Sequence, residues 1–114
     1  MRKVELFFKR LKGLFLGFDS IEKTEEPDGS VLIDSDGFAL KFRVDDQHFE
    51  IIQVKPKPGK RCGVTLLRLI ADFCEDRHLE PVLGNQEVDD FVSKLMPEFA
   101  SAAHKHALPT VSVH

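Results

Sequence analysis

The chain has 114 residues and a net charge of −3 at pH 7, with 42% hydrophobic and 31% charged residues. These values are typical of one globular domain spanning residues 1–114, and the negative charge argues against nucleic-acid binding. No apolar run approaches the ~20 residues that a membrane span needs, and two cysteines without a C-x-x-C pair predict a reducing, cytoplasmic location.

An amphipathic basic helix is predicted over residues 1–17, because apolar residues recur at helical spacing. Five cations lie between residues 2 and 12, against the single acid Glu5. We expect this helix to dock on the protein's own sheet; a membrane surface, a homodimer or a protein partner contacted through residues 2–16 are the alternatives. The apolar positions are Val4, Phe7, Phe8, Leu11 and Phe15.

The middle of the chain predicts an antiparallel meander of three to four strands. Apolar and polar residues alternate from Phe38 to Val44, which is the clearest strand pattern, and residues 31–33 and 48–54 form flanking strands. Turn-forming residues occupy 27–30, 34–37 and 45–47.

Two helices are predicted in the C-terminal part. The first covers residues 64–78, with apolar residues on one face. A short strand at 81–83 follows, and Asn85 then caps a second helix that Pro97 ends or kinks. Residues 100–107 add a helical turn. The fold class is therefore α+β, with an N-terminal helix, a meander and two C-terminal helices.

A basic glycine loop joins the strand at 48–54 to the helix at 64–78. Amides at the start of a helix, together with nearby cations, form the usual binding site for phosphate groups. An ordinary turn that requires glycine for its geometry is the alternative interpretation. The loop cations are Lys55, Lys57, Lys60 and Arg61.

Residues 31–99 resemble the C-terminal part of the GNAT superfamily of N-acyltransferases. Val54 and Pro56 match the family's V-x-P strand exit, and Gly59–Gly63 overlies its glycine loop. Asn85 begins a segment similar to the family's N-x-x-A-x-x-L-Y-x-K-L, with Val88, Phe91, Lys94 and Leu95 at the later positions.

The resemblance implies an acyl-coenzyme A cofactor, with its pyrophosphate on the loop amides, and an amine acceptor. Arg61 stands at the family's first loop glycine and Val92 at its tyrosine, so we expect an N-acetyltransferase-like domain whose catalysis is weak or lost. The cofactor-binding residues implied are Val54, Gly59, Lys60, Arg61, Cys62, Gly63, Val64, Thr65 and Asn85.

Candidate catalytic residues lie on the strand that leads into the loop. Glu50 and His48 are two residues apart, hence on one face of a strand, and Glu50 is the candidate general base, directly or through water. Cys62 in the basic loop is a weaker candidate nucleophile, with His48 as its partner. The C-terminal histidines lack metal-ligand spacing, so no metal site is predicted.

Two other classes of function compete with an acyltransferase. A helix, a three-stranded meander and a helix also occur in that order in small secretion chaperones and adaptors, which predicts a non-catalytic interaction module. The same order resembles the double-stranded-RNA-binding domain, but its Lys-Lys-x-Ala-Lys helix start is absent.

Overall fold

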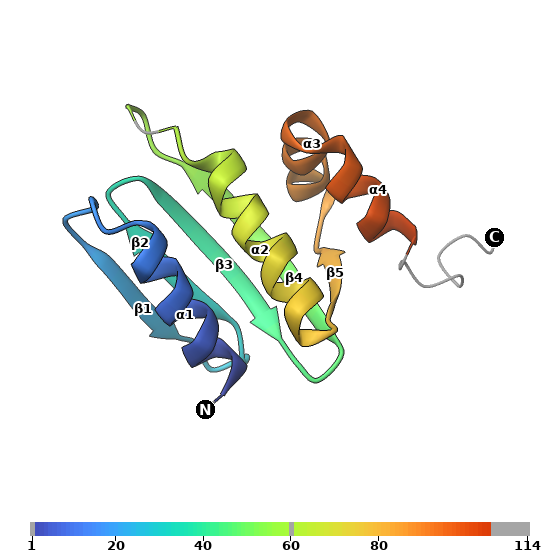
Figure 1. Ribbon diagram of the computed structural model, residues 1–114, viewed down its shortest axis with the longest axis horizontal. Helices are drawn as coiled ribbons and strands as arrows, with labels where there is room; N and C mark the ends of the chain where they lie inside the picture. Colours follow the sequence, from blue (N-terminus) through green and yellow to red (C-terminus); the bar gives the residue numbers. More distant parts are fainter. Residues whose placement is uncertain (1, 60, 106–114) are drawn as a thin grey trace.

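Figure 1 shows the computed structural model of the chain, which describes residues 2–59 and 61–105. The helices and strands are, in chain order, α1 (Lys3–Leu14), β1 (Ile21–Glu25), β2 (Val31–Ser35), β3 (Phe38–Val44), β4 (His48–Pro56), α2 (Gly63–Arg77), β5 (Glu80–Leu83), α3 (Gln86–Leu95) and α4 (Pro97–Lys105).

The strands form one mixed sheet in the order β1-β2-β3-β4-β5. Neighbours from β1 to β4 pair antiparallel, whereas β5 returns after α2 and pairs parallel to β4. Gln53 pairs with Lys41 and Ile51 with Phe42, so Ile52 is an extra residue in β4. Such a β-bulge bends the strand and increases its local twist.

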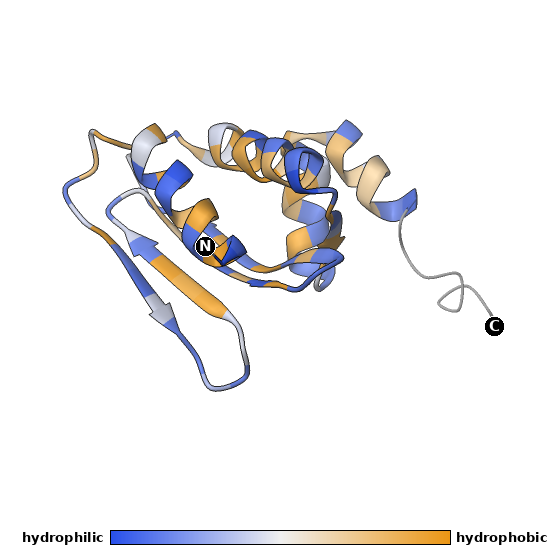
Figure 2. Cartoon of the chain, turned by 60° about the horizontal axis from the view of Figure 1, so that its bottom comes forward, coloured by the Kyte–Doolittle hydropathy of each residue, from blue (hydrophilic) through white to orange (hydrophobic). Residues whose placement is uncertain are grey.

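The core lies between the sheet and the helices α1 and α2. Phe7 of α1 packs edge-on against Phe42, Phe49 and Phe73, which come from β3, β4 and α2. Figure 2 shows hydrophobic residues along the strands and helices that surround this interior. Ten phenylalanines and no Tyr or Trp suit such a core, because their rings carry no polar group that needs a partner.

The helices α3 and α4 pack against each other beside β5 (Figure 1). Asn85 caps α3 by accepting a hydrogen bond from the Val88 amide at 2.9 Å. His104 of α4 lies 2.7 Å from an Asp89 oxygen of α3. This contact, together with a bond from Ser93, holds the pKa of Asp89 below its usual value.

The structure confirms the α+β class and corrects the predicted meander. The sheet has five strands, because Ile21–Glu25 forms β1 and the predicted short strand joins as β5. Sequence patterning misses β1 because Ile21 is its only large apolar residue. Its charged residues instead pair with α1: Lys23 Nζ lies 2.8 Å from Glu5 Oε2, and Arg2 bonds Glu25 at 2.7 Å.

The predicted helices are present with small shifts at their ends. The helix expected at 64–78 is α2, and Pro97 begins α4 rather than only ending α3, since proline is well tolerated at the first helical position. The part of the predicted turn that falls on 106–107 lies outside the described residues. None of the helices formed by residues 2–59 and 61–105 combines the length and hydropathy that crossing a membrane requires.

Candidate functional site

The start of α2 forms the center of the candidate site. The chain leaves β4 at Pro56, turns at Gly59, whose φ of +87° favours glycine, and enters the helix at Gly63. Arg61, Val64 and Thr65 are exposed there, whereas Val54 is buried at the end of β4. Lys60 lies outside the described residues.

The electrostatics of this helix start are unbalanced. The first turn of α2 contains no acidic residue, and its N-cap residue Cys62 makes no capping hydrogen bond with its side chain. In contrast, the first turn of α3 has an Asn85 cap and two acidic residues, Glu87 and Asp89. The positive end of the α2 dipole therefore has the exposed Arg61 just before it and no carboxylate in its first turn.

One predicted loop cation is already engaged. Lys57 Nζ bonds Asp34 Oδ1 at 2.7 Å and also bonds the Ser35 carbonyl oxygen. The Lys57 amide donates to the Gly37 carbonyl at 2.9 Å. Lys57 therefore anchors the loop to the β2–β3 turn, which leaves Arg61 as an exposed described cation just before α2. Lys55 is exposed on the sheet face opposite to that of its buried neighbour Val54.

Gly63 is required for helix packing. A Cβ at Gly63 would lie 2.9 Å from Leu95 Cδ1 and 3.4 Å from Phe91 Cζ of α3. The α3 side of the helix start is therefore closed by these side chains. The opposite side is open, since Val64 is 38% exposed.

Asn85 lies where β4 and β5 stop pairing. The last parallel pair is Ile51 with Leu83, after which the Gly84 amide donates to the Ile51 carbonyl at 2.8 Å. Asn85 Nδ2 donates to the carbonyl of the bulged Ile52 at 2.8 Å, while its Oδ1 caps α3. Asn85 thus fixes the strand separation, and both ends of its amide are already bonded.

Glu50 and His48 lie on the same face of β4, opposite the core residues Phe49 and Ile51. Glu50 Oε1 accepts a hydrogen bond from Arg43 Nη1 at 2.9 Å. His48 lies between two carboxylates, with Nδ1 3.5 Å from Asp45 Oδ1 and Nε2 3.7 Å from a Glu80 oxygen. The pair is thus on the sheet face that points away from α2.

Asp45 holds the turn before His48. Its carboxylate accepts hydrogen bonds from the backbone amides of Gln47, at 2.8 Å, and His48, at 2.7 Å. These bonds stabilise the charged form and lower the pKa of Asp45. The histidine is consequently positioned by the turn as well as by the strand.

The Cys62 thiol is buried and bonds to the protein backbone. Cys62 is 5% exposed, and its Sγ–H donates to the Gly37 carbonyl oxygen at 3.4 Å, so His48 is not its hydrogen-bond partner in that contact. Burial raises the pKa of the Cys74 thiol to about 12. Neither cysteine is therefore accessible to solvent, as a reactive thiol is.

We expect both cysteines to resist alkylation in the folded protein. At pH 8, iodoacetamide should modify Cys74 roughly 1,000-fold more slowly than in the unfolded chain, because its pKa rises from 9.0 to about 12. Peptide mass spectrometry against a time course in guanidinium measures both sites separately. Fast native alkylation of Cys62 would contradict the buried thiol and revive it as a nucleophile.

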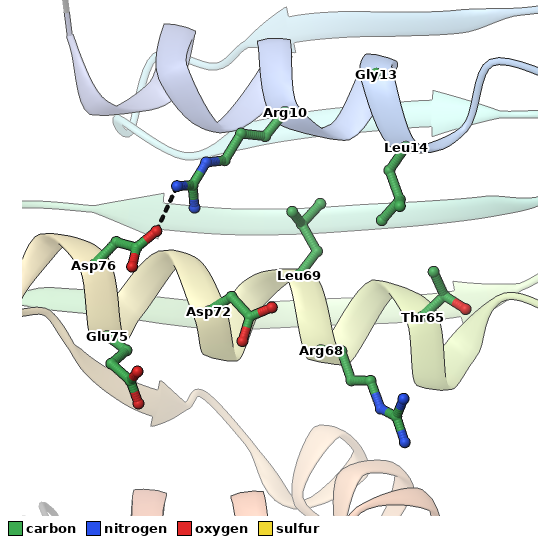
Figure 3. A pocket seen from close by; sticks show the side chains of 9 residues that line it. All are labelled: Arg10, Gly13, Leu14, Thr65, Arg68, Leu69, Asp72, Glu75 and Asp76. Carbon is green, nitrogen blue, oxygen red and sulfur yellow. Dashed lines mark hydrogen bonds and ion pairs between the residues drawn. The ribbon is translucent and has the colours of Figure 1, made fainter.

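A groove separates α1 from α2 on the outer surface, a feature that sequence analysis missed. It has a volume of about 700 Å³, and its lining includes Leu14, Leu69 and Thr65. Figure 3 shows Arg10 reaching across one end to bond Asp76. The sequence signal was the apolar Leu14, which lies at the edge of the predicted apolar stripe, seven residues after Phe7.

Within residues 2–59 and 61–105, no group of three or more His, Cys, Asp or Glu residues is arranged to hold a metal ion. His106 and His114 lie outside the described residues. Comparisons of the chain with known protein families, curated proteins and solved structures find no match.

Proposed function

We propose that this protein binds acyl-coenzyme A as an N-acetyltransferase-like domain. The supporting observation is the start of α2: a helix dipole without an acidic residue in its first turn, which follows the end of β4 and has the exposed Arg61 just before it. Such an arrangement concentrates positive potential that a pyrophosphate would neutralise. The order strand, basic loop, helix and parallel strand supports the same interpretation.

Within this proposal, binding and chemistry occupy different places. The backbone amides of Val64 and Thr65, with Arg61, would hold the pyrophosphate. Asn85 acts as a positioning residue that links β4 to the start of α3, since its own amide group is engaged. Glu50 remains the candidate base for an amine acceptor, with Arg43 as its ion-pair partner.

Coenzyme A should raise the melting temperature of the protein. Ligand linkage adds about 2.7 kcal/mol to the free energy of unfolding at a free ligand concentration about 100 times Kd. Arg61→Glu should weaken binding by roughly 10–100-fold, because a charge-assisted bond contributes about 1.5–3 kcal/mol. Differential scanning fluorimetry and isothermal titration calorimetry measure these effects.

Lys94→Glu is the matched control, because it makes the same charge change at an exposed position on α3. Inorganic pyrophosphate is a second probe. Binding of pyrophosphate without binding of coenzyme A would leave an anion site but overturn the acyl-coenzyme A proposal. A melting temperature that changes with neither coenzyme A nor pyrophosphate at millimolar concentration would reject both the cofactor and the anion site.

A non-catalytic interaction module is the second candidate, favoured by the groove between α1 and α2. Leu14, which lines this groove, is 49% exposed. Deleting residues 1–16 is not a usable test, because Phe7 and Leu11 belong to the core.

A further inference from the structure

We propose that the outer edge of β1 pairs with β1 of a second copy of this chain, in antiparallel orientation across a two-fold axis. The open main chain of this edge and the order of charges along the strand carry the inference. It does not rest on coenzyme A binding, which involves the start of α2 rather than β1.

The edge of the sheet at β1 is open. β1 is the first strand in the sheet order, so β2 pairs with one side of it and the other side forms the sheet edge. Figures 1 and 2 both show β1 on the outside of the sheet, with no helix or strand of the described residues beyond it. The helix α1 packs elsewhere, since its Phe7 contacts Phe42 and Phe49 of β3 and β4. A further strand can therefore reach this edge.

The main-chain groups of this edge point outward at alternate residues. The Glu26 amide donates to the Ser30 carbonyl oxygen at 2.9 Å, at the turn that joins β1 to β2. Because bonded positions alternate along an antiparallel pair, the even-numbered residues of β1 bond to β2. The odd-numbered residues direct their N–H and C=O groups away from the sheet, and these are Ile21, Lys23 and Glu25.

The charges of β1 complement the same strand in reverse. Around the neutral Thr24, the cation Lys23 precedes and the acid Glu25 follows. In an antiparallel pair centred on Thr24 of both copies, Lys23 of each copy lies directly opposite Glu25 of the other. Such opposed pairs stabilise a sheet, whereas like charges directly opposite destabilise it.

Charge also selects this register among the two-fold alternatives. A pair centred on any charged residue of β1 places two identical charges opposite each other at the axis. A pair centred on Ile21 sets the strand opposite residues that precede β1, and so pairs little of it. The register centred on Thr24 therefore satisfies both the main chain and the charges.

The ion pairs already present on this face do not prevent the contact. Lys23 Nζ lies 2.8 Å from Glu5 Oε2 and 3.6 Å from Glu25 Oε2 of its own chain. The Glu25 side chain is 44% exposed and bonds Arg2 at 2.7 Å. In the dimer, the two sets interleave into one network of alternating sign, which can bind more strongly than isolated surface pairs.

A cysteine on the two-fold axis tests the register directly. Thr24 is exposed, and its Cα should lie about 4.5 Å from that of its symmetry mate, as in a pair without main-chain bonds. This separation falls in the range of about 4.4–6.8 Å that a disulfide spans. Thr24→Cys should therefore form a covalent dimer under mild oxidation, read on a non-reducing gel. The matched Glu22→Cys should not, since its two copies lie far from the axis.

Opposite charge reversals test the pairing without a cross-link. Lys23→Glu and Glu25→Lys should each weaken dimerisation by about tenfold, because each places like charges at both symmetry-related contacts. An equimolar mixture of the two variants should restore the dimer, because positions 23 and 25 then carry opposite charges across both contacts. Sedimentation velocity over a concentration series measures the association.

One reversal should instead strengthen the dimer. Glu22 lies opposite Glu26 of the other copy, where Lys41 at 2.9 Å from Glu26 offsets part of the repulsion. Glu22→Lys should thus tighten association, and Lys94→Glu on α3 should leave it unchanged. A wild-type chain that stays monomeric at millimolar concentration would overturn the proposal, as would Thr24→Cys cross-linking no faster than Glu22→Cys.

Discussion

Phe7→Ala should lower the free energy of unfolding by about 3–5 kcal/mol, the range for removing a fully buried phenylalanine. Phe7 is 0% exposed, and its ring centroid lies 5.0 Å from those of Phe42 and Phe49 and 5.3 Å from that of Phe73. One side chain thus joins α1 to two strands and α2. Urea denaturation followed by circular dichroism measures the loss.

Phe8→Ala is the matched control for this prediction. Phe8 is the neighbouring residue of the same type, but it is only half-buried and lies under Lys12 Nζ at 4.8 Å and Lys23 Nζ at 5.5 Å. Its removal should cost about 1–2 kcal/mol, from partial burial and weak cation–π contacts. Equal losses for the two variants would contradict the placement of Phe7 at the center of the core.

Gly84→Ala should destabilise the protein by about 1–3 kcal/mol, the usual cost of overpacking a tight site. A Cβ at this position would lie 2.7 Å from the Ile51 carbonyl oxygen and 3.2 Å from Glu50 Oε2. The carbonyl belongs to β4 and already accepts the Gly84 amide, so the strand itself would have to move. Thermal and urea denaturation report the change in stability.

Gly17→Ala separates this effect from the general cost of replacing glycine. A Cβ on Gly17 meets nothing within 4 Å, and its φ is outside the left-handed region. The free energy of unfolding should therefore change by no more than about 0.5 kcal/mol. A Gly84 variant as stable as the Gly17 variant would mean that β5 does not approach β4 as closely as described.

The Gly84 variant also bears on the candidate site. Gly84 precedes Asn85, which bonds the carbonyl of the bulged Ile52 and so links β4 to the start of α3. A displaced β5 would move Asn85 and the start of α3 together. Coenzyme A binding measured on a folded Gly84→Ala protein would thus show whether the position of Asn85 matters for the cofactor, independently of the loop cations.

The two glycines at the ends of the β4–α2–β5 crossover show what local patterning cannot decide. In the sequence Gly63 fits a phosphate loop, yet in the fold its missing side chain also leaves room for Leu95 of α3. In the sequence Gly84 only follows a short predicted strand, yet in the fold the backbone of β4 excludes any side chain there. Both restrictions come from segments far along the chain, to which a local sequence pattern is not sensitive.

Sequence patterns were sufficient to predict the helices and strands in which buried residues recur at a regular spacing. Alternation in Phe38–Val44 and helical spacing in residues 64–78 reflect one buried face each, so β3 and α2 follow directly. The basic loop and the Asn85 cap were also visible, because their chemistry is local.

Three features could be seen only in the folded structure: the strand β1, the bonds of Lys57 to the β2–β3 turn, and the groove between α1 and α2. The strand Ile21–Glu25 lacks an alternating apolar pattern in its own sequence. It is held instead by its pairing with β2 and by its ion pairs with α1. Lys57 is bound by Asp34, 23 residues earlier in the chain. These features depend on contacts between distant residues, whereas sequence periodicity reports only which face of one element is buried.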